Sequence, residues 1–143
     1  MNEINSYTVM LAKIRAHRLT EQVMDSALTA FDVSLMQWLS LGAVRKYEGV
    51  TSTTELAREL NVSTPYISKL VKDLEAKSLV TVNPGSEDKR WRDITLTSKS
   101  KKLLDDSEPL VRQALKEWLQ PIDKEHVDVY IQVLMKVAYQ LPG

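Results

Sequence analysis

The chain has 143 residues, of which 43% are hydrophobic and 27% charged, and this size and composition predict one globular domain with its own core. Because it contains no cysteine, disulfides, thiolate metal sites and cysteine redox sensing are excluded. No apolar run reaches the length of a membrane-spanning helix, and basic side chains interrupt the first 30 residues, so we expect a cytoplasmic protein without a secretory signal.

The formal charges cancel over the whole chain but are unevenly distributed along it. Residues 63–102 carry nine Lys and Arg against five Asp and Glu. The flanking segments 1–62 and 103–143 carry six against seven and four against seven. The middle of the chain is therefore moderately positive, which is compatible with a local anionic partner.

Helical spacing of apolar residues dominates the first half of the chain. It predicts one long amphipathic helix over the first 30 residues, and a second helix that follows Asp32 or Ser34 and ends at Gly49. Ser52 and Glu55 stand at capping-box spacing and predict the start of a short third helix. A fourth helix is expected from Ser63 or Thr64, with a buried stripe made of Ile67, Leu70, Val71 and Leu74.

The second half begins with strand character. Residues 79–82 and 91–96 flank the turn-rich segment NPGSEDKR and predict a β-hairpin. Thr97 or Ser98 caps a further helix, which Pro109 is expected to kink or split. Asp123 starts the last helix, whose inward positions are predicted to be Val127, Tyr130, Leu134, Val137 and Leu141.

The third and fourth helices are joined at the spacing of a helix-turn-helix. Ala57 is small where the helices approach, Asn61 tolerates positive φ at the turn, and Ile67 enters the core. In this motif the N-terminal half of the second helix enters the major groove of DNA. Hydroxyl, phenol and ammonium groups gather there, so we predict as DNA-binding residues Ser63, Thr64, Pro65, Tyr66, Ser68, Lys69 and Lys72.

The hairpin that follows directly would be the wing of this motif. Its tip carries Asp88, Lys89 and Arg90, and an arginine there suits the negative potential of a narrow minor groove. Structural alternatives remain: Tyr66 could pack on a neighbouring helix, and Lys69 and Lys72 could be solvated charges. Lys99, Lys101 and Lys102 could contact phosphates or only solvate a helix start.

Three segments resemble the MarR family of winged helix-turn-helix transcription regulators, over nearly the full length of the chain. They are VSLMQWLSL, ELAREL-NVSTPYISKLVKDLEAKSLV and EDKRWRDITLT, which correspond to the second helix, the helix-turn-helix and the wing. The resemblance implies a homodimer with interleaved terminal helices, and it implies that Arg90 reaches the minor groove while Asp88 holds the charged groups of the wing. The chain departs from the family at Ser78 and Ser100, where glycine is common, at Trp91, where a small residue is usual, and at Pro109.

These features predict a mainly α fold with a small β-hairpin wing, as one domain over 1–143. Residues 31–103 would form the winged helix-turn-helix core, and 1–30 and 104–143 the dimerisation helices. The terminal apolar stripes exceed what so small a core can cover, which independently favours association. Relatives commonly bind small anionic aromatic effectors between these parts. The resemblance allows for such an effector here, but Trp38 and Trp118 are expected in the core or an interface.

We therefore expect a sequence-specific regulator of transcription, a homodimeric repressor that binds a pseudo-palindromic operator in double-stranded DNA. The alternative is a winged-helix protein-interaction module, which would have a neutral or acidic helix face and wing. An enzyme is not expected, because no nucleophile–base pair, paired carboxylates or phosphate loop stands at useful spacing. No cofactor or metal is expected either, since His17 and His126 are the only histidines. The terminal helices are not basic, which argues against membrane binding.

Overall fold

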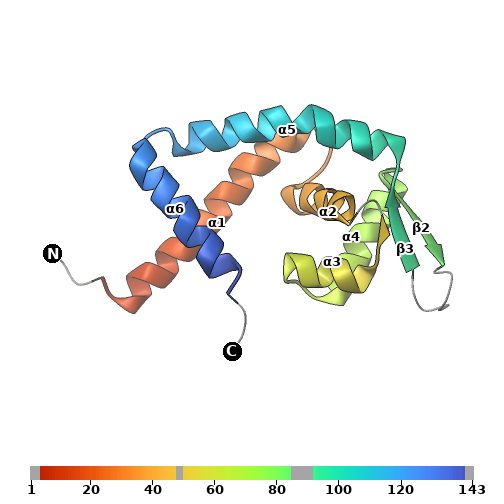
Figure 1. The fold of residues 1–143 in the computed structure, drawn as a ribbon, viewed down its shortest axis with the longest axis horizontal. Helices are drawn as coiled ribbons and strands as arrows, with labels where there is room; N and C mark the ends of the chain where they lie inside the picture. The colour runs from red at the N-terminus through yellow and green to blue at the C-terminus, as the bar shows by residue number, and fades with distance from the viewer. Residues whose placement is uncertain (1–3, 48–49, 85–91, 141–143) are drawn as a thin grey trace.

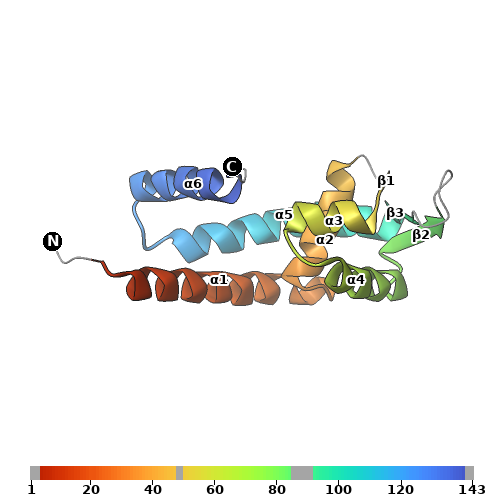
Figure 2. The same cartoon turned by 90° about the horizontal axis from the view of Figure 1, so that it is seen from below.

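A computed structural model describes residues 4–47, 50–84 and 92–140. The elements are α1 (Ser6–Leu28), the 3-10 helix η1 (Thr29–Phe31), α2 (Leu35–Lys46), β1 (Val50–Thr51), α3 (Thr53–Leu60), α4 (Thr64–Ala76), β2 (Val80–Pro84), β3 (Arg92–Leu96), α5 (Ser98–Leu119) and α6 (Lys124–Ala138). In Figure 1, α2, α3, α4 and the strands form a winged lobe on the right, and α5 leads away from it toward α6. In Figure 1, α5 runs across the top of the molecule, with α1 and α6 below it, and Figure 2 shows the same elements from below.

Side-chain caps start the helices at the places that the sequence indicates. Ser52 with Glu55 forms the predicted capping box of α3, and Thr97 forms one with Ser100 at the start of α5. Asp123 caps α6. The second helix is capped by Ser34, whereas Asp32 ends η1 in the left-handed region with φ 55°. The helix-start predictions are therefore confirmed.

The predicted hairpin is confirmed and belongs to a slightly larger sheet. Strands β2 and β3 pair antiparallel, with Val82 opposite Ile94, and β1 adds to the free edge of β3. The strand β1 has only two residues, too few to produce an alternating pattern, so the sequence does not reveal it. Its pairing with the distant β3 defines it.

The core lies inside the winged lobe and is sealed by the ends of α1 and α5. Its fully buried apolar side chains include Leu28 at the end of α1 and, within the lobe, Leu41, Leu56, Ile67, Leu74, Leu79 and Ile94. Helix α5 contributes Leu103, Leu104 and Val111. In contrast, no residue of α6 is buried in the single chain. Tyr130, Leu134 and Val137, which were predicted to face inward, are about half exposed.

Pro109 was predicted to kink or split its helix; α5 is continuous through Pro109, so a split does not occur. Proline removes one main-chain hydrogen bond and crowds the preceding turn, which weakens a helix locally. Ser107 before it and Val111 after it are both buried against the rest of the chain. This packing holds the two halves of α5 in one helix.

Candidate nucleic-acid interface

The turn between α3 and α4 has the geometry that the helix-turn-helix spacing predicts. Asn61 is left-handed, with φ 53° and ψ 48°, and its N–H donates to the carbonyl of Arg58 at 3.2 Å. The N–H of Val62 donates to the carbonyl of Ala57 at 3.0 Å, which completes the paired hydrogen bonds of a Schellman helix end. Ala57 and Ile67 are buried, as expected. The turn therefore fixes the direction in which α4 leaves the lobe.

The start of α4 is capped and otherwise open to solvent. Ser63 is the N-cap, and its Oγ accepts a hydrogen bond from the N–H of Tyr66 at 3.3 Å. Pro65 stands in the first turn, where its missing N–H removes no helical hydrogen bond. The predicted buried stripe of Ile67, Leu70, Val71 and Leu74 is confirmed. One face of α4 is thus buried in the core, and the rest of its first turns is exposed to solvent.

Most of the predicted recognition residues lie on that free side. Ser63, Thr64, Pro65, Tyr66, Lys69 and Lys72 are exposed, and Ser68 is half-buried. Tyr66 is 45% exposed, and with Lys69 it lines an open hollow of about 260 Å³ against Ser34 and Gln37 of α2. Neither Lys69 nor Lys72 forms an ion pair with any residue that the structure describes. Their charges are therefore not neutralised by the described part of the lobe.

Other lysines of the positive middle region are already engaged. The ammonium group of Lys99 donates to the carbonyl of Lys77 at 2.8 Å. Lys102 hydrogen-bonds Asp106 at 2.7 Å, and this carboxylate raises the pKa of Lys102. Lys101 is exposed, and its ammonium has no hydrogen bond among the described residues. Contact of these lysines with phosphates stays a prediction.

The wing residues Asp88, Lys89 and Arg90 lie outside the described residues, as does Trp91. The structure describes the strands up to Pro84 and again from Arg92. The assignment of Asp88, Lys89 and Arg90 stays a prediction.

The neighbouring surface of the lobe differs in charge from α4. Lys46 at the end of α2 hydrogen-bonds Glu59 of α3 at 2.7 Å, and Tyr47 donates to the same carboxylate at 3.2 Å. The hydrogen bond from Lys46 lowers the pKa of Glu59, and the carboxylate raises the pKa of Lys46. The charge of Lys46 is therefore neutralised by Glu59, whereas Lys69 and Lys72 of α4 have no such partner among the described residues.

The acidic residues of α5 do not form a metal site. Asp105, Asp106 and Glu108 each face a different basic partner: Arg45 at 3.0 Å, Lys102 at 2.7 Å and Arg112 at 3.0 Å. Within the described ranges, no group of three His, Asp or Glu side chains is arranged to hold a metal ion.

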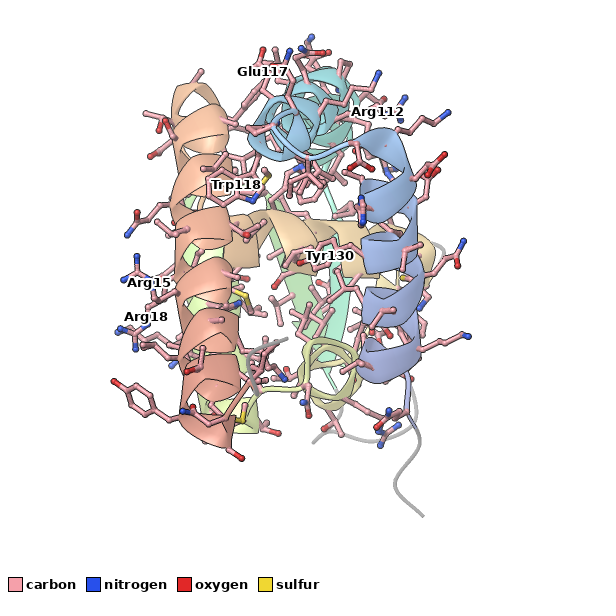
Figure 3. All side chains as sticks on the ribbon, turned by 90° about the vertical axis from the view of Figure 1, so that its left-hand side faces the viewer. Arg15, Arg18, Arg112, Glu117, Trp118 and Tyr130 are labelled. Carbon is pink, nitrogen blue, oxygen red and sulfur yellow. The ribbon has the colours of Figure 1, made fainter. Side chains whose placement is uncertain are left out.

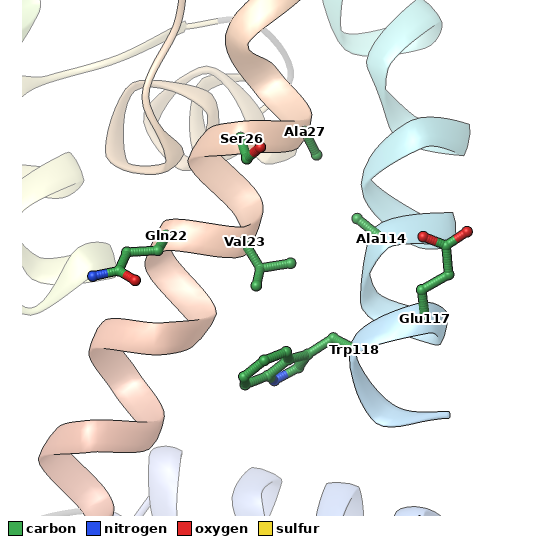
Figure 4. A pocket seen from close by; sticks show the side chains of 7 residues that line it. All are labelled: Gln22, Val23, Ser26, Ala27, Ala114, Glu117 and Trp118. Atoms are coloured by element: carbon green, nitrogen blue, oxygen red, sulfur yellow. The ribbon is translucent and has the colours of Figure 1, made fainter. Parts of the chain in front are cut away.

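Trp38 of α2 and Trp118 of α5 both line open cavities, which the sequence did not indicate. Trp118 reaches from α5 toward α1 and lines a cavity of about 580 Å³ with Val23 and Ala114 (Figure 4). Trp38 lines a cavity of about 370 Å³ between α2 and α5, and its indole N–H donates to the buried Ser107 hydroxyl at 2.9 Å. A Cβ at Gly42 in this second cavity would meet no atom within 4 Å, so packing does not require glycine there.

In the described part of the chain no single helix is long and apolar enough to cross a membrane. The segment Ser6–Phe31 together with α2 reaches that length and composition, but the two are bent by 75° at their junction.

Comparison with known proteins gives a consistent result. Residues 31–90 match the model of the MarR family. The structure is similar to a mutant MarR from E. coli complexed with operator DNA, with a TM-score of 0.82 and 19% identity over 99% of this chain and 100% of that chain. It is also similar to a MarR-family transcriptional regulator from Rhodococcus sp. RHA1, with a TM-score of 0.85 and 18% identity over 96% and 97% of the two chains.

A third similar structure is BpsR from Bordetella bronchiseptica, described for the regulation of its DNA binding by 6-hydroxynicotinic acid. Its TM-score is 0.85 at 17% identity, over 99% of this chain and all of that one. At such identities the likeness concerns the fold. The family model matches the helix-turn-helix and much of the wing, and the remaining helices complete the same fold. Residues 31–90 therefore resemble the MarR family, and the chain has the winged helix-turn-helix fold of the MarR-family structures.

Proposed function

We propose that this protein is a homodimeric, sequence-specific DNA-binding regulator that represses transcription by occupying a pseudo-palindromic operator. The observation that carries the proposal is the exposed, polar N-terminal half of α4, on a helix whose opposite face is fixed in the core. Lys69 and Lys72 lie on this exposed side without ion pairs among the described residues. An ammonium group in that situation can neutralise a DNA phosphate and release its counterion.

The homodimer is proposed from the apolar surfaces that the single chain leaves uncovered. Helix α6 has 15 residues and buries none of them, and at the start of α1 Tyr7 is 75% exposed. Trp118 and Tyr130 point toward the space between α1 and α6, whereas Arg15 and Arg18 point away from it (Figure 3). So large an apolar surface on a small protein is a mark of an interface. A second copy of the chain would cover it.

Two-fold symmetry sets the form of the DNA site. Each protomer would place α4 in one major-groove half-site and its wing, including Arg90, in the adjacent minor groove. The half-sites would then repeat about one helical turn apart, or ~34–36 Å. Tyr66 and the hydroxyls of Ser63 and Thr64 would lie nearest the base edges.

Selection from random duplex DNA on the purified full-length protein tests the proposal. We expect enrichment of one pseudo-palindromic sequence with half-sites one helical turn apart. A selection that enriches no sequence would overturn the proposal and would favour a winged-helix protein-interaction module.

A salt titration on the selected operator tests the assigned contacts. Lys72→Ala should lower the slope of log affinity against log salt by about one phosphate per protomer, and Arg90→Ala should weaken binding. Lys124→Ala at the start of α6, far from the lobe, is a matched control for the lost charge and should leave both quantities unchanged. If both test variants kept the wild-type affinity and salt slope, the proposed DNA contacts of Lys72 and Arg90 would be wrong.

The proposal extends to release of the operator by a small molecule. The cavity between α2 and α5 supports it, because it joins the winged lobe to the scaffold and is lined by Trp38 and Arg45. Small aromatic acids that raise the melting temperature of the protein should also weaken its binding to the operator. If every stabilising compound left operator affinity unchanged, this part of the proposal would fail.

A further inference from the structure

The C-terminal end of α4 is tied to other elements by side-chain hydrogen bonds. Lys77 is the C-cap that follows the last residue of α4, and its ammonium group donates to the main-chain carbonyl of Asp32 at 2.6 Å and to Oε1 of Gln37 at 3.2 Å. The carbonyl of Lys77 accepts from the ammonium of Lys99 in the first turn of α5 at 2.8 Å. The hydroxyl of Thr97 donates to the carbonyl of Ser78 at 2.8 Å. This end of the helix is therefore held from two sides.

The corner that receives the Lys77 ammonium is itself fixed to α1. Gln37 belongs to the capping box of α2, and its Oε1 also accepts from the N–H of Ser34 at 3.1 Å. The carboxylate of Asp25 in α1 accepts from the N–H of Leu35 at 2.6 Å. A chain of hydrogen bonds thus runs from α1 through the start of α2 to the end of α4.

Lys77 makes these contacts mainly through hydrogen bonds to neutral oxygen atoms. The nearest carboxylate oxygen, Oδ2 of Asp32, lies 3.9 Å away on a side chain that is 92% exposed, so this ion pair contributes little. The Lys77 side chain is only 31% exposed, unlike Lys69 and Lys72, which are open to solvent. An ammonium group has three donors on a flexible stem and can reach a carbonyl and an amide oxygen at once.

Because these contacts hold the C-terminal end of α4, a small change in the angle of the helix there displaces its N-terminal end. The helix has 13 residues and at a rise of 1.5 Å per residue is about 20 Å long. A tilt of about 10° at the held end would move the exposed end by about 3 Å, close to the separation of neighbouring base pairs. The angle of α4 against the scaffold therefore decides whether two recognition helices can fit two half-sites together.

We propose that Lys77 is a positioning residue, which sets the angle of α4 against α1 and α5 and so the spacing of the two recognition helices in the dimer. The inference rests on the proposed DNA-binding function and adds a residue that does not touch DNA. It predicts that Lys77 controls discrimination between operators of different half-site spacing, and that it does so without neutralising a phosphate.

The test compares Lys77→Met, Lys77→Arg and the control Lys124→Met on three duplexes: the selected operator, and the same operator with one base pair added or removed between its half-sites. Affinities are corrected for the active fraction by stoichiometric titration, and the salt slope is measured for each variant. We expect Lys77→Met to bind the selected operator about tenfold more weakly and to lose most of its preference among the three spacings. Its salt slope should equal that of the wild type, Lys77→Arg should restore the preference, and Lys124→Met should behave as the wild type.

Two results would overturn the inference: wild-type affinity and spacing preference in Lys77→Met, or a salt slope lower by about one phosphate per protomer, since Lys77 would then contact DNA directly. If Lys77→Met does not fold, Lys99→Met serves instead, because it removes the hydrogen bond to the Lys77 carbonyl and should weaken the same preference. Failure of the wild type to bind any selected duplex would instead overturn the proposed function, and the positioning role with it.

Discussion

The winged lobe and the terminal helices contain similar apolar residues but cover them in opposite ways. In the lobe, Leu56, Ile67, Leu74 and Ile94 are almost completely removed from solvent by other parts of the same chain. In α6, every apolar side chain larger than alanine remains partly or largely exposed, although the helix is as regular as any in the lobe. A single chain buries the apolar side chains of the lobe but leaves those of α6 exposed.

The arrangement of polar residues explains the difference between α4 and α6. The buried stripe of α4 follows i, i+3, i+4, i+7 and leaves a broad polar side for solvent or DNA. Apart from His126, the polar residues of α6 form a single stripe of Lys124, Glu125, Asp128, Gln132 and Lys136, with apolar side chains around most of the rest. A helix of this kind is stable in water only when other helices surround it. The same helical periodicity thus gives α4 one buried and one exposed polar side, and gives α6 an apolar surface that the single chain leaves exposed.

The largest effect is expected for Ile67→Ala in the lobe. Ile67 is fully buried, and truncating such a side chain costs about 2–5 kcal/mol of the free energy of unfolding. The matched change Ile131→Ala lies in α6, where the side chain is 43% exposed. Denaturant unfolding should show the loss for Ile67→Ala at every protein concentration, whereas Ile131→Ala should be nearly neutral at concentrations too low for dimers. If the two variants lost the same free energy of unfolding at low protein concentration, the proposed difference between the lobe and α6 would be wrong.

The second largest effect is expected on dimerisation, for a substitution in α6. Leu134→Asp places a charge on the apolar face that a second copy would cover, and should raise the dissociation constant of the dimer about 100-fold, as expected at a buried interface position. Sedimentation equilibrium measures this constant, and circular dichroism checks that the lobe stays folded. Gln132→Asp adds the same charge on the polar stripe, about 160° away around the helix, and should leave the dimer intact. A wild-type dissociation constant for Leu134→Asp would place the interface elsewhere.

The two regions also differ in what the sequence could predict. Helix starts were predictable because caps are local: Ser52, Ser63, Thr97 and Asp123 each bind a main-chain N–H three residues away. The turn at Asn61 was predictable for the same reason. The exposed face of α4 followed directly from its periodicity.

Contacts between distant segments could not be predicted in this way. The Trp38–Ser107 hydrogen bond joins residues 69 positions apart, and the contact from Lys77 to Asp32 joins residues 45 apart. Periodicity gives the face of a helix but not its neighbour, so these pairs become visible only in the folded chain. The inward prediction for Tyr130 and Leu134 was wrong for the single chain because the pattern of α6 does not say which chain covers it.

A smaller effect is expected where the two regions are joined. Ser107→Ala removes the acceptor of the Trp38 indole N–H, which links α2 of the lobe to α5, and leaves a half-buried donor unpaired. We expect a loss of about 1–2 kcal/mol in the free energy of unfolding. Ser98→Ala makes the same change at an exposed position in the first turn of α5 and should cost less than about 0.5 kcal/mol. A loss in Ser107→Ala no greater than in this control would show that the hydrogen bond does not couple the regions.

The smallest effect is expected at the end of α4, and it is the only predicted increase in stability. Ser78 has φ 60°, and its N–H and that of Leu79 donate to the carbonyls of Glu75 and Leu74 in a Schellman helix end. A side chain is disfavoured in this left-handed conformation and glycine is not, so Ser78→Gly should stabilise the protein by about 0.5–1 kcal/mol in thermal or denaturant unfolding. Ser98→Gly makes the same change at the first residue of α5, where φ is not positive, and should not stabilise the protein. If Ser78→Gly lowered stability, the contacts of the serine side chain would outweigh the backbone strain. The end of α4 would then be held more by side chains than by its left-handed turn.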